Sequence, residues 1–274
     1  MQYVYPVVSR RAGGLSIGLN LSPTARCLFA CVYCQVAGEM NIKSQKREQE
    51  IDIPQLESEL REMVCMVVSG ELFQDEIFRR TPTNKRILRD IAFSGDGEPT
   101  LCSQFPEIVQ RVVAIRAERC PETTKLIAIT NGSCLELPSI REALRIIQTN
   151  NGEVWAKLDA GTEEHFRTVS RSSLPYEKIL SNLVSTAKEF PIVIQSCFLS
   201  LRGITPSVEE VRAYITRLRE IADAGGTIQR VQVYTVARQP PEPWVRALSD
   251  GRIDEIAATI RRETNLVVET FYSR

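Results

Sequence analysis

Three cysteines lie close together in this sequence, in the segment Cys27-Leu-Phe-Ala-Cys31-Val-Tyr-Cys34. Thiolates are soft ligands that select iron–sulfur clusters, zinc or copper(I). The spacing of three and then two intervening residues can bring all three sulfurs to one face of a single loop. A 4Fe–4S cluster usually has four cysteine ligands, and the next cysteine in the chain is Cys65. A cluster held by this loop would keep one iron open for another ligand, which indicates chemistry at that iron.

Zinc is the alternative metal for these cysteines. A structural zinc site uses four ligands in paired clusters, and the sequence contains neither a second C-x-x-C nor an H-x3-H pair. The single histidine, His165, is predicted to be a polar residue at the start of a helix. The other cysteines are scattered singly and are expected to behave as small apolar residues. The pattern therefore favours the iron–sulfur cluster over zinc.

Polar residues and glycines follow four short apolar segments further along the chain. They are Gly95, Asp96, Gly97, Glu98 and Pro99, then Thr130 and Asn131, then Lys157 and Asp159, and finally Gln195 and Ser196. Glycine lets the backbone approach a ligand, and carboxylate and ammonium groups bind charged ligands. A buried lysine or aspartate without a partner is costly, so Lys157 and Asp159 in one short segment favour a ligand. Ordinary turns are the alternative interpretation of the first two groups.

The elements that must position these residues alternate along the chain. Apolar, β-rich segments at 15–21, 87–94, 125–131, 153–158, 191–199 and 228–236 predict strands. Helical spacing lies between them, at 56–67, 105–112, 176–187 and 208–218, and a last helix near 253–263 precedes a strand-like tail at 266–271. Ser207 and Glu210 are predicted to form a capping box. Such alternation predicts parallel strands in an α/β fold, either an open or partial barrel or a doubly wound sheet, with ligands at the carboxyl ends of the strands.

Taken in order, these residues resemble the radical S-adenosylmethionine (SAM) superfamily, whose signature is C-x3-C-x-aromatic-C, with Tyr33 at the aromatic position. The resemblance covers roughly residues 15–236. It implies a partial (β/α)6 TIM-like barrel, in one domain over residues 1–274 with a short helix–strand extension at 237–274. It also implies that Cys27, Cys31 and Cys34 hold a 4Fe–4S cluster and that SAM chelates its fourth iron.

The same resemblance implies which residues contact SAM. They are Tyr33, Gly95, Asp96, Gly97, Glu98, Pro99, Thr130, Asn131, Lys157, Asp159, Gln195 and Ser196. Asp96 stands where many members have the first glycine of a Gly-Gly-Glu-Pro element. Lys157 is expected to pair with the SAM carboxylate and Asp159 to accept from ribose hydroxyls, whereas the strand at 228–236 is expected to offer only backbone contacts. For Arg171 and Arg202, surface ion pairs are the default expectation and anion contacts the alternative.

The resemblance implies a radical SAM enzyme, in which the reduced cluster cleaves SAM to a 5′-deoxyadenosyl radical that abstracts hydrogen from a substrate. An electron donor such as flavodoxin or ferredoxin is the expected partner. The closest subgroup is akin to wybutosine-type enzymes, which act on tRNA, so a tRNA base is the leading substrate and a protein or peptide the alternative. A non-catalytic iron–sulfur electron-transfer module is the competing class. For the basic segment 79–89, a solvated loop or helix face is the default expectation and a phosphate-binding surface the alternative. Segment 69–86 is a candidate lid or partner surface.

Bulk composition limits the remaining classes. The chain has 274 residues, 43% hydrophobic and 25% charged, with a formal net charge of zero. A dedicated nucleic-acid binder usually carries a basic excess, so only a local patch could serve that role here. The sequence contains no stretch of membrane-spanning length and no secretory signal at its start, and we therefore expect a cytoplasmic protein.

Overall fold

The computed structural model describes residues 1–36 and 49–273. The chain forms two compact units. The first contains Met1–Arg26, Lys46–Thr130 and Leu137–Val154, and the second contains Cys27–Gln45, Asn131–Glu136 and Trp155–Arg274. The expectation of one domain with an extension at 237–274 stays a prediction.

The sheet of the first unit begins with the strands β1 (Val4–Ser9), β2 (Gly14–Asn20), β3 (Leu88–Ser94) and β4 (Lys125–Thr130), in that spatial order. β1 pairs antiparallel with β2, whereas β2, β3 and β4 are parallel. All seven residues of β2 are buried, as expected for a strand covered on both faces. Pro6 lies in β1 at the sheet edge, where a missing N–H is tolerated.

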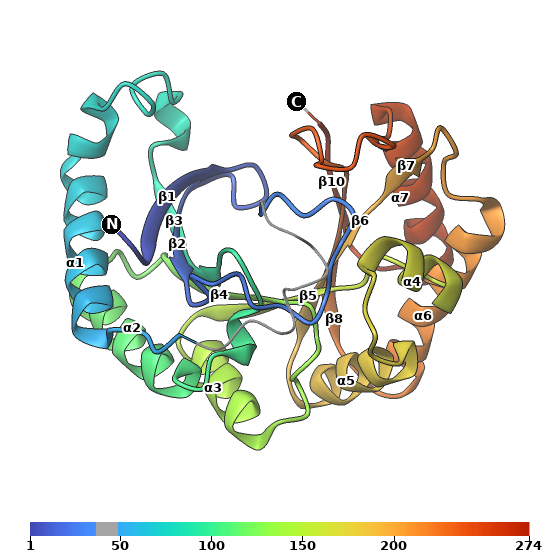
Figure 1. Ribbon diagram of the computed structural model, residues 1–274, viewed down its shortest axis with the longest axis horizontal. Helices are drawn as coiled ribbons and strands as arrows, with labels where there is room; N and C mark the ends of the chain where they lie inside the picture. Colours follow the sequence, from blue (N-terminus) through green and yellow to red (C-terminus); the bar gives the residue numbers. More distant parts are fainter. Residues whose placement is uncertain (37–48, 274) are drawn as a thin grey trace. The chain divides into compact units, whose positions relative to one another are not determined.

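Three helices accompany these strands: α1 (Ile53–Ser69), α2 (Phe105–Arg119) and α3 (Pro138–Thr149). They follow one another along one side of the sheet of this unit (Figure 1). α1 begins at Asp52, whose side chain accepts from the Gln55 N–H, and ends at Gly70, whose φ of 82° favours glycine. The long connection between α1 and β3 holds two short 3-10 helices, Glu71–Gln74 and Thr83–Lys85, and a third, Pro99–Leu101, follows β3.

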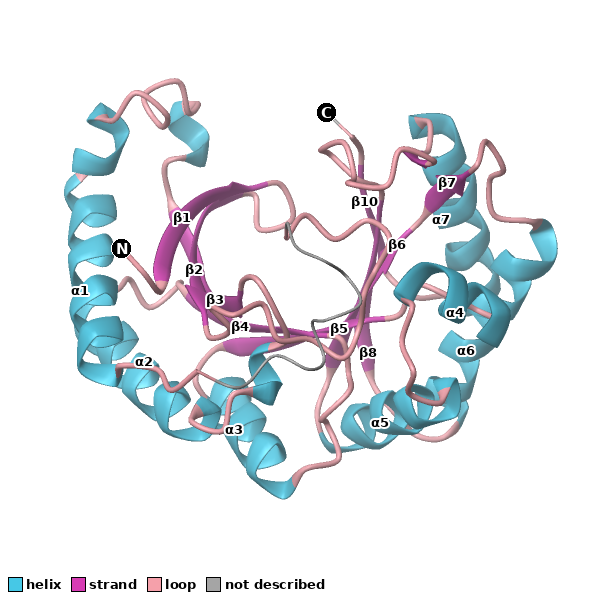
Figure 2. Cartoon of the chain, viewed as in Figure 1, coloured by secondary structure: helices cyan, strands magenta, loops and turns pink. Residues whose placement is uncertain are grey.

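The second unit contains the parallel strands β6 (Ile192–Cys197), β8 (Ile228–Tyr234) and β10 (Val268–Phe271). Its helices are α4 (Glu163–Ser170), α5 (Tyr176–Glu189), α6 (Val208–Asp223) and α7 (Asp250–Thr264). Figure 2 shows α6 and α7 along one side of β6 and β8. A separate antiparallel pair is formed by β7 (Leu199–Leu201) and β9 (Val245–Ala247).

The predicted α/β fold with the order of a (β/α)6 barrel is confirmed. The sheet order is β1-β2-β3-β4-β5-β6-β8-β10, with β5 (Gly152–Lys157) contributing residues to both units. A helix follows each of β2, β3, β4, β5, β6 and β8 along the chain. Those are the six predicted strands, each placed within two residues, and the predicted helix and strand at the C-terminal end are also present. The strands β1, β7 and β9 and the helix α3 were not predicted. In α3, however, Ile140, Ala143, Leu144 and Ile147 have helical spacing and are buried.

One local prediction needs correction. The Ser207 side chain accepts from the Glu210 N–H, as a helix cap should. The Glu210 carboxylate does not complete a capping box. It accepts instead from the Gly161 N–H at 2.5 Å and the Thr162 Oγ1 at 2.6 Å. The tertiary fold therefore uses this carboxylate to hold the loop after β5.

No helix in the part of the chain that the structure describes is both long and apolar enough to cross a membrane.

Candidate cofactor site

The cysteine loop of the second unit is fastened by backbone hydrogen bonds to the end of α4. The N–H groups of Ala30 and Val32, on either side of Cys31, donate to the carbonyls of Ser170 and Val169, both at 2.9 Å. Just past the helix, the Ser172 hydroxyl donates to the Leu28 carbonyl at 3.0 Å. The loop therefore has a fixed backbone, which is what a multi-ligand site requires.

Hydrogen-bond donors point at the first cysteine of the motif. The Cys27 Sγ accepts from the Phe29 N–H and from the Asn131 Nδ2, both at 3.4 Å. The Cys34 N–H donates to the Cys31 carbonyl at 3.0 Å and closes the turn of the second pair. Burial raises the pKa of the Cys31 thiol, and the Lys157 charge partly opposes that effect. N–H groups directed at sulfur suit a metal-bound thiolate, because they stabilise its negative charge.

Tyr33, the aromatic residue of the motif, is hydrogen-bonded to Asp159 at the end of β5. Its hydroxyl donates to Asp159 Oδ2, while Asp159 Oδ1 accepts from the Cys197 N–H at 2.8 Å. The Lys157 Nζ lies 3.3 Å from Asp159 Oδ2 and donates to the Tyr234 hydroxyl at 2.8 Å. These contacts join the cysteine loop to the ends of three strands.

Lys157 and Asp159 therefore partner each other. Their side chains are 17% and 2% exposed. Burial lowers the pKa of Lys157, but the charge of Asp159 and the neighbouring Tyr234 outweigh it, so the pKa is raised overall. The ion pair itself, together with Tyr33 and Tyr234, already gives both buried side chains partners. Their burial therefore does not by itself require a ligand. Their contacts to SAM stay predictions.

Gln195 and Ser196 have different surroundings. The Gln195 Nε2 donates to Gln232 Oε1 at 2.8 Å on the neighbouring strand β8, and its own Oε1 is buried without a partner among the described residues. Ser196 bonds instead to the Tyr214 hydroxyl of α6 at 2.6 Å. Adjacent residues of a strand point to opposite faces, so Ser196 is occupied by a helix contact, whereas Gln195 offers a buried acceptor to a ligand.

In the first unit, Glu98 and Thr130 are brought together. The Glu98 Oε1 accepts from Thr130 Oγ1 at 2.7 Å and from Thr100 Oγ1 at 2.6 Å, and this side chain is only 3% exposed. The Glu98 N–H donates to the Arg26 carbonyl at 3.0 Å. A buried carboxylate at the end of two adjacent parallel strands suits a cationic ligand.

The glycine turn before Glu98 has little room for side chains. A Cβ on Gly97 would lie 2.2 Å from the Arg26 carbonyl oxygen and 2.4 Å from the Ser22 hydroxyl. Gly95 has a φ of 125°, which favours glycine. Asp96 exchanges two hydrogen bonds with the Asn20 side chain, at 2.8 and 3.2 Å. This explains locally why an aspartate is accepted at this position.

Two site-lining residues were not predicted from the sequence. Asn20 ends β2 and Tyr234 ends β8, so both are polar residues at the ends of buried strands, as the predicted residues are. That signal was available at both positions. The Tyr234 hydroxyl contacts Lys157, and Gln232 of the same strand contacts Gln195, so two β8 side chains lie beside predicted site residues.

The residues present fit an iron–sulfur cluster by their donor chemistry. None of the eight cysteines, all of which lie in the described ranges, forms a disulfide, so Cys27, Cys31 and Cys34 keep their thiols for a metal. Within residues 1–36 and 49–273, no three His, Cys, Asp or Glu side chains are arranged to hold one metal ion. A 4Fe–4S cluster places each cysteine on a separate iron and does not need the three sulfurs around a single ion.

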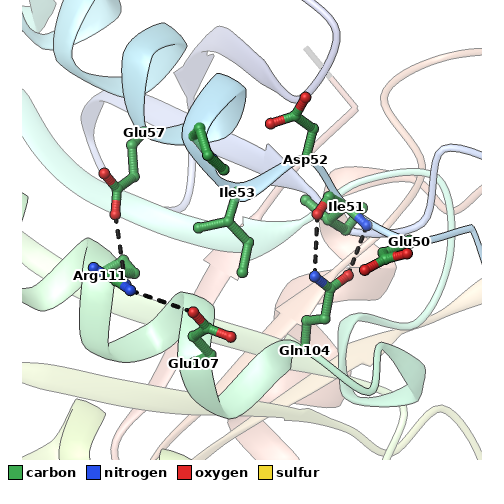
Figure 3. Close-up of a pocket in the computed structure, with 9 residues that line it drawn as sticks. Glu50, Ile51, Asp52, Ile53, Glu57, Gln104, Glu107 and Arg111 are labelled. Carbon is green, nitrogen blue, oxygen red and sulfur yellow. Dashed lines mark hydrogen bonds and ion pairs between the residues drawn. The ribbon is translucent and has the colours of Figure 1, made fainter.

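A separate hollow in the first unit does not contain any predicted site residue. Its volume is about 640 Å3, and it lies at the start of α1 and on α2 (Figure 3). Figure 3 shows Arg111 between two carboxylates, Glu57 at 3.7 Å and Glu107 at 3.4 Å. The Gln104 side chain is bonded to the backbone of Ile51. The side chains of Arg111 and Gln104 thus already have partners within this hollow.

Comparison with known proteins shows distant relatives. No family model matches the chain. It is 27% identical over 243 residues to the UPF0026 protein MJ1312 of Methanocaldococcus jannaschii, and 26% identical over 191 residues to the UPF0026 protein slr1464 of Synechocystis. The alignments cover 88% and 68% of this chain. A GTPase Obg of Brachyspira hyodysenteriae is 25% identical over 252 residues, which is 91% of this chain.

The chain spans only part of these relatives: 32% of the Obg protein, 65% of MJ1312 and 60% of slr1464. A P-loop for GTP ends in Gly-Lys-Ser or Gly-Lys-Thr, and this sequence contains no Gly-Lys pair. The GTPase activity in the name of the Obg protein is therefore said of that longer protein alone.

Solved structures share the fold. Archaeal TYW1 superposes with a TM-score of 0.52 at 13% identity, over 92% of this chain and 72% of that one. A mutant of spore photoproduct lyase superposes with a TM-score of 0.60 at 9% identity, over all of this chain and 80% of the other. At these identities the likeness establishes the fold. It agrees with the strand and helix order described above.

Proposed function

We propose that this protein is a radical SAM enzyme. The observation that carries the proposal is the cysteine loop, fixed at α4 and joined through Tyr33 to Asp159 at the end of β5. The fold is shared with archaeal TYW1 and spore photoproduct lyase, both radical SAM enzymes. Cys27, Cys31 and Cys34 would hold a 4Fe–4S cluster, which when reduced supplies the electron that cleaves SAM to a 5′-deoxyadenosyl radical.

The side chains near the cysteine loop have roles that follow from their contacts. Asn131 donates to the Cys27 sulfur and stabilises its charge. Lys157 keeps a positive charge in a largely buried position, which would attract an anionic group of a ligand. The Gln195 Oε1, which has no partner within residues 1–36 and 49–273, would accept from a ligand donor. Glu98 provides a buried carboxylate, suited to an ammonium group.

We infer that the substrate is macromolecular, with a tRNA base as the first candidate. The likeness of the fold to TYW1 and the basic segment 79–89 support this choice. In this segment Arg79 and Arg80 are exposed, whereas Arg86 is used internally, donating to the carbonyls of Thr81 and Arg79 at 2.9 and 2.8 Å. A protein or peptide substrate is the alternative.

Reconstitution tests the reaction class. The protein is loaded with iron and sulfide without oxygen, and SAM and dithionite are added. We expect about four irons per chain, a brown chromophore and release of 5′-deoxyadenosine. Cys31→Ala should lose all three, while Cys65→Ala, at an exposed cysteine outside the motif, should retain them. A fully loaded cluster without 5′-deoxyadenosine would favour the electron-transfer module instead.

Salt dependence tests the substrate class. If segment 79–89 contacts tRNA phosphates, the affinity should fall steeply with salt, and Arg79→Glu with Arg80→Glu should reduce that slope. A salt-independent affinity, or binding unchanged in the double variant, would favour the protein or peptide substrate.

A further inference from the structure

A positively charged surface lies directly beside the cysteine loop in the second unit. It consists of Arg171, Arg202, Arg246 and Trp244, and is here called the arginine surface. All three arginines are exposed, and Trp244 is partly buried. Neither the proposed reaction nor the predicted SAM contacts use any of these residues.

The arginine surface is held together by contacts to Trp244. The guanidinium groups of Arg171 and Arg202 lie 5.5 and 5.3 Å from the centre of the Trp244 ring. The Arg202 N–H donates to the Trp244 carbonyl at 2.8 Å. In the pairing of β7 with β9, Arg246 lies opposite Ser200. These contacts hold the guanidinium groups of Arg171 and Arg202 at defined positions around Trp244.

The middle of the cysteine loop and the residue after it both contact segments that carry the arginines. Arg171 directly follows Ser170, whose carbonyl accepts from the Ala30 N–H. On the other side, Gln35, next to Cys34, donates to the carbonyl of Gln239, and the Gln239 side chain accepts from Arg246 at 3.1 Å. Trp244 and Tyr33 also pack against the same buried group around Val32. A partner bound here would therefore lie close to the metal-binding loop.

Charge decides which kind of partner fits. Glu242 accepts from Arg171 at 2.7 Å and from the Trp244 indole at 2.6 Å. Among the described residues, the three arginines against the Glu242 carboxylate leave a positive excess. An acidic protein is attracted to such a patch, and its association is accelerated. RNA fits less well, because a dedicated nucleic-acid binder usually carries a basic excess and this chain has a formal net charge of zero.

We propose that the arginine surface is the docking site of an acidic one-electron carrier protein; this rests on the proposed function, which requires a reduced cluster. A flavodoxin in its anionic hydroquinone form would pass one electron to the oxidised cluster. The flavin becomes the neutral semiquinone, the cluster is reduced by one electron, and no bond to the protein forms or breaks.

The test uses the reconstituted full chain with flavodoxin and two charge-reversal variants. Arg202→Glu with Arg246→Glu changes the arginine surface. Arg212→Glu with Arg262→Glu makes the same charge change at exposed positions of α6 and α7. Thermal unfolding confirms that both variants fold. Flavodoxin association is measured as a function of salt, and cluster reduction is followed by electron paramagnetic resonance without SAM.

We expect R202E/R246E to slow flavodoxin association by about tenfold to a hundredfold at low salt, and to slow cluster reduction by flavodoxin in parallel. Reduction by dithionite should be unchanged in the same variant, and R212E/R262E should behave as the parent chain. Equal association for both variants, or no flavodoxin binding to the parent chain at low salt, would overturn the proposal. Loss of tRNA binding with retained flavodoxin binding would overturn it in favour of RNA.

The outcome separates this proposal from the reaction class. Association and cluster reduction are measured before any SAM is present, so they do not depend on SAM cleavage. Absence of 5′-deoxyadenosine with dithionite would reject the proposed enzyme, whereas the docking result would still stand on its own measurement.

Discussion

The Tyr33 hydroxyl donates a hydrogen bond to the Asp159 carboxylate, across 126 positions of sequence. Tyr33 belongs to the cysteine motif and Asp159 to the residues that follow β5, so one bond joins two groups that the sequence analysis treated separately. Burial and the neighbouring Asp159 charge raise the pKa of Tyr33, which keeps its hydroxyl protonated as a donor. The aromatic position of the motif thus helps to anchor the loop.

Tyr33→Phe should loosen the cysteine loop. It leaves the Asp159 oxygen without its hydroxyl donor, a loss of about 1–3 kcal/mol for a buried acceptor. We expect lower iron retention during anaerobic gel filtration and a lower free energy of unfolding. Tyr234→Phe is the matched control, since it removes a hydroxyl that accepts from Lys157 and leaves the loop anchor intact. Equal iron retention in both variants would contradict the anchoring role.

Breaking the Lys157–Asp159 pair on one side should cost more than removing both charges. Lys157→Met leaves a buried carboxylate without its cation, and such single removals typically cost about 3–5 kcal/mol. The double variant Lys157→Met with Asp159→Asn should recover part of that loss, because neither charge is left alone. Denaturant unfolding of the two single variants and the double variant gives the coupling energy. Purely additive losses would mean that the pair is not coupled.

Gly97→Ala should distort the turn that carries Glu98. Its Cβ would lie 2.2 Å from the Arg26 carbonyl oxygen, so the backbone must shift and the Glu98 hydrogen bond to that oxygen weakens. We expect destabilisation of about 1–3 kcal/mol, as for other overpacked sites, and weaker SAM binding by calorimetry. Gly251→Ala is the control, because a Cβ there has no atom within 4 Å. Unchanged stability and SAM affinity in Gly97→Ala would show that the turn can adapt.

Asp90 should make stability fall as the pH rises. Burial is the main cause that raises its pKa from 3.8 to about 6, despite the opposing hydrogen bond from Ser16. The folded state therefore holds the proton more tightly than the unfolded state. The stability that Asp90 contributes is fully present below the pKa of Asp90 in the unfolded chain. It is lost as the pH rises through about 6.

The rise in the Asp90 pKa from 3.8 to about 6 corresponds to a contribution of roughly 3 kcal/mol to the free energy of unfolding. Asp90→Asn should remove this pH dependence and be more stable than the parent chain above that range. Urea unfolding across the range measures both effects. An Asp90→Asn variant whose stability keeps the same pH slope as that of the parent chain would contradict this role of Asp90.

The sequence by itself determined the order of the elements and the positions of the chemistry-bearing turns. Apolar runs and helical spacing are local signals, and the six predicted strands followed from them to within two residues. The three-cysteine motif is also local, because its residues are neighbours in one loop. Glycine at position 97 could be anticipated as a close-approach residue from the turn composition alone.

Only the tertiary structure decided how the polar side chains are satisfied. The Glu210 carboxylate could have completed a helix cap, but it binds the loop at Gly161. The sequence of Lys157 and Asp159 is the same whether the two side chains contact a ligand or each other. The fold places the Lys157 Nζ 3.3 Å from Asp159 Oδ2. The Ser196 hydroxyl bonds to Tyr214 of α6, on the face of β6 opposite to the Gln195 side chain. Each of these partners is distant in sequence, and the fold decides which of them lies next to a buried donor or acceptor. Short-range sequence patterns do not contain that information.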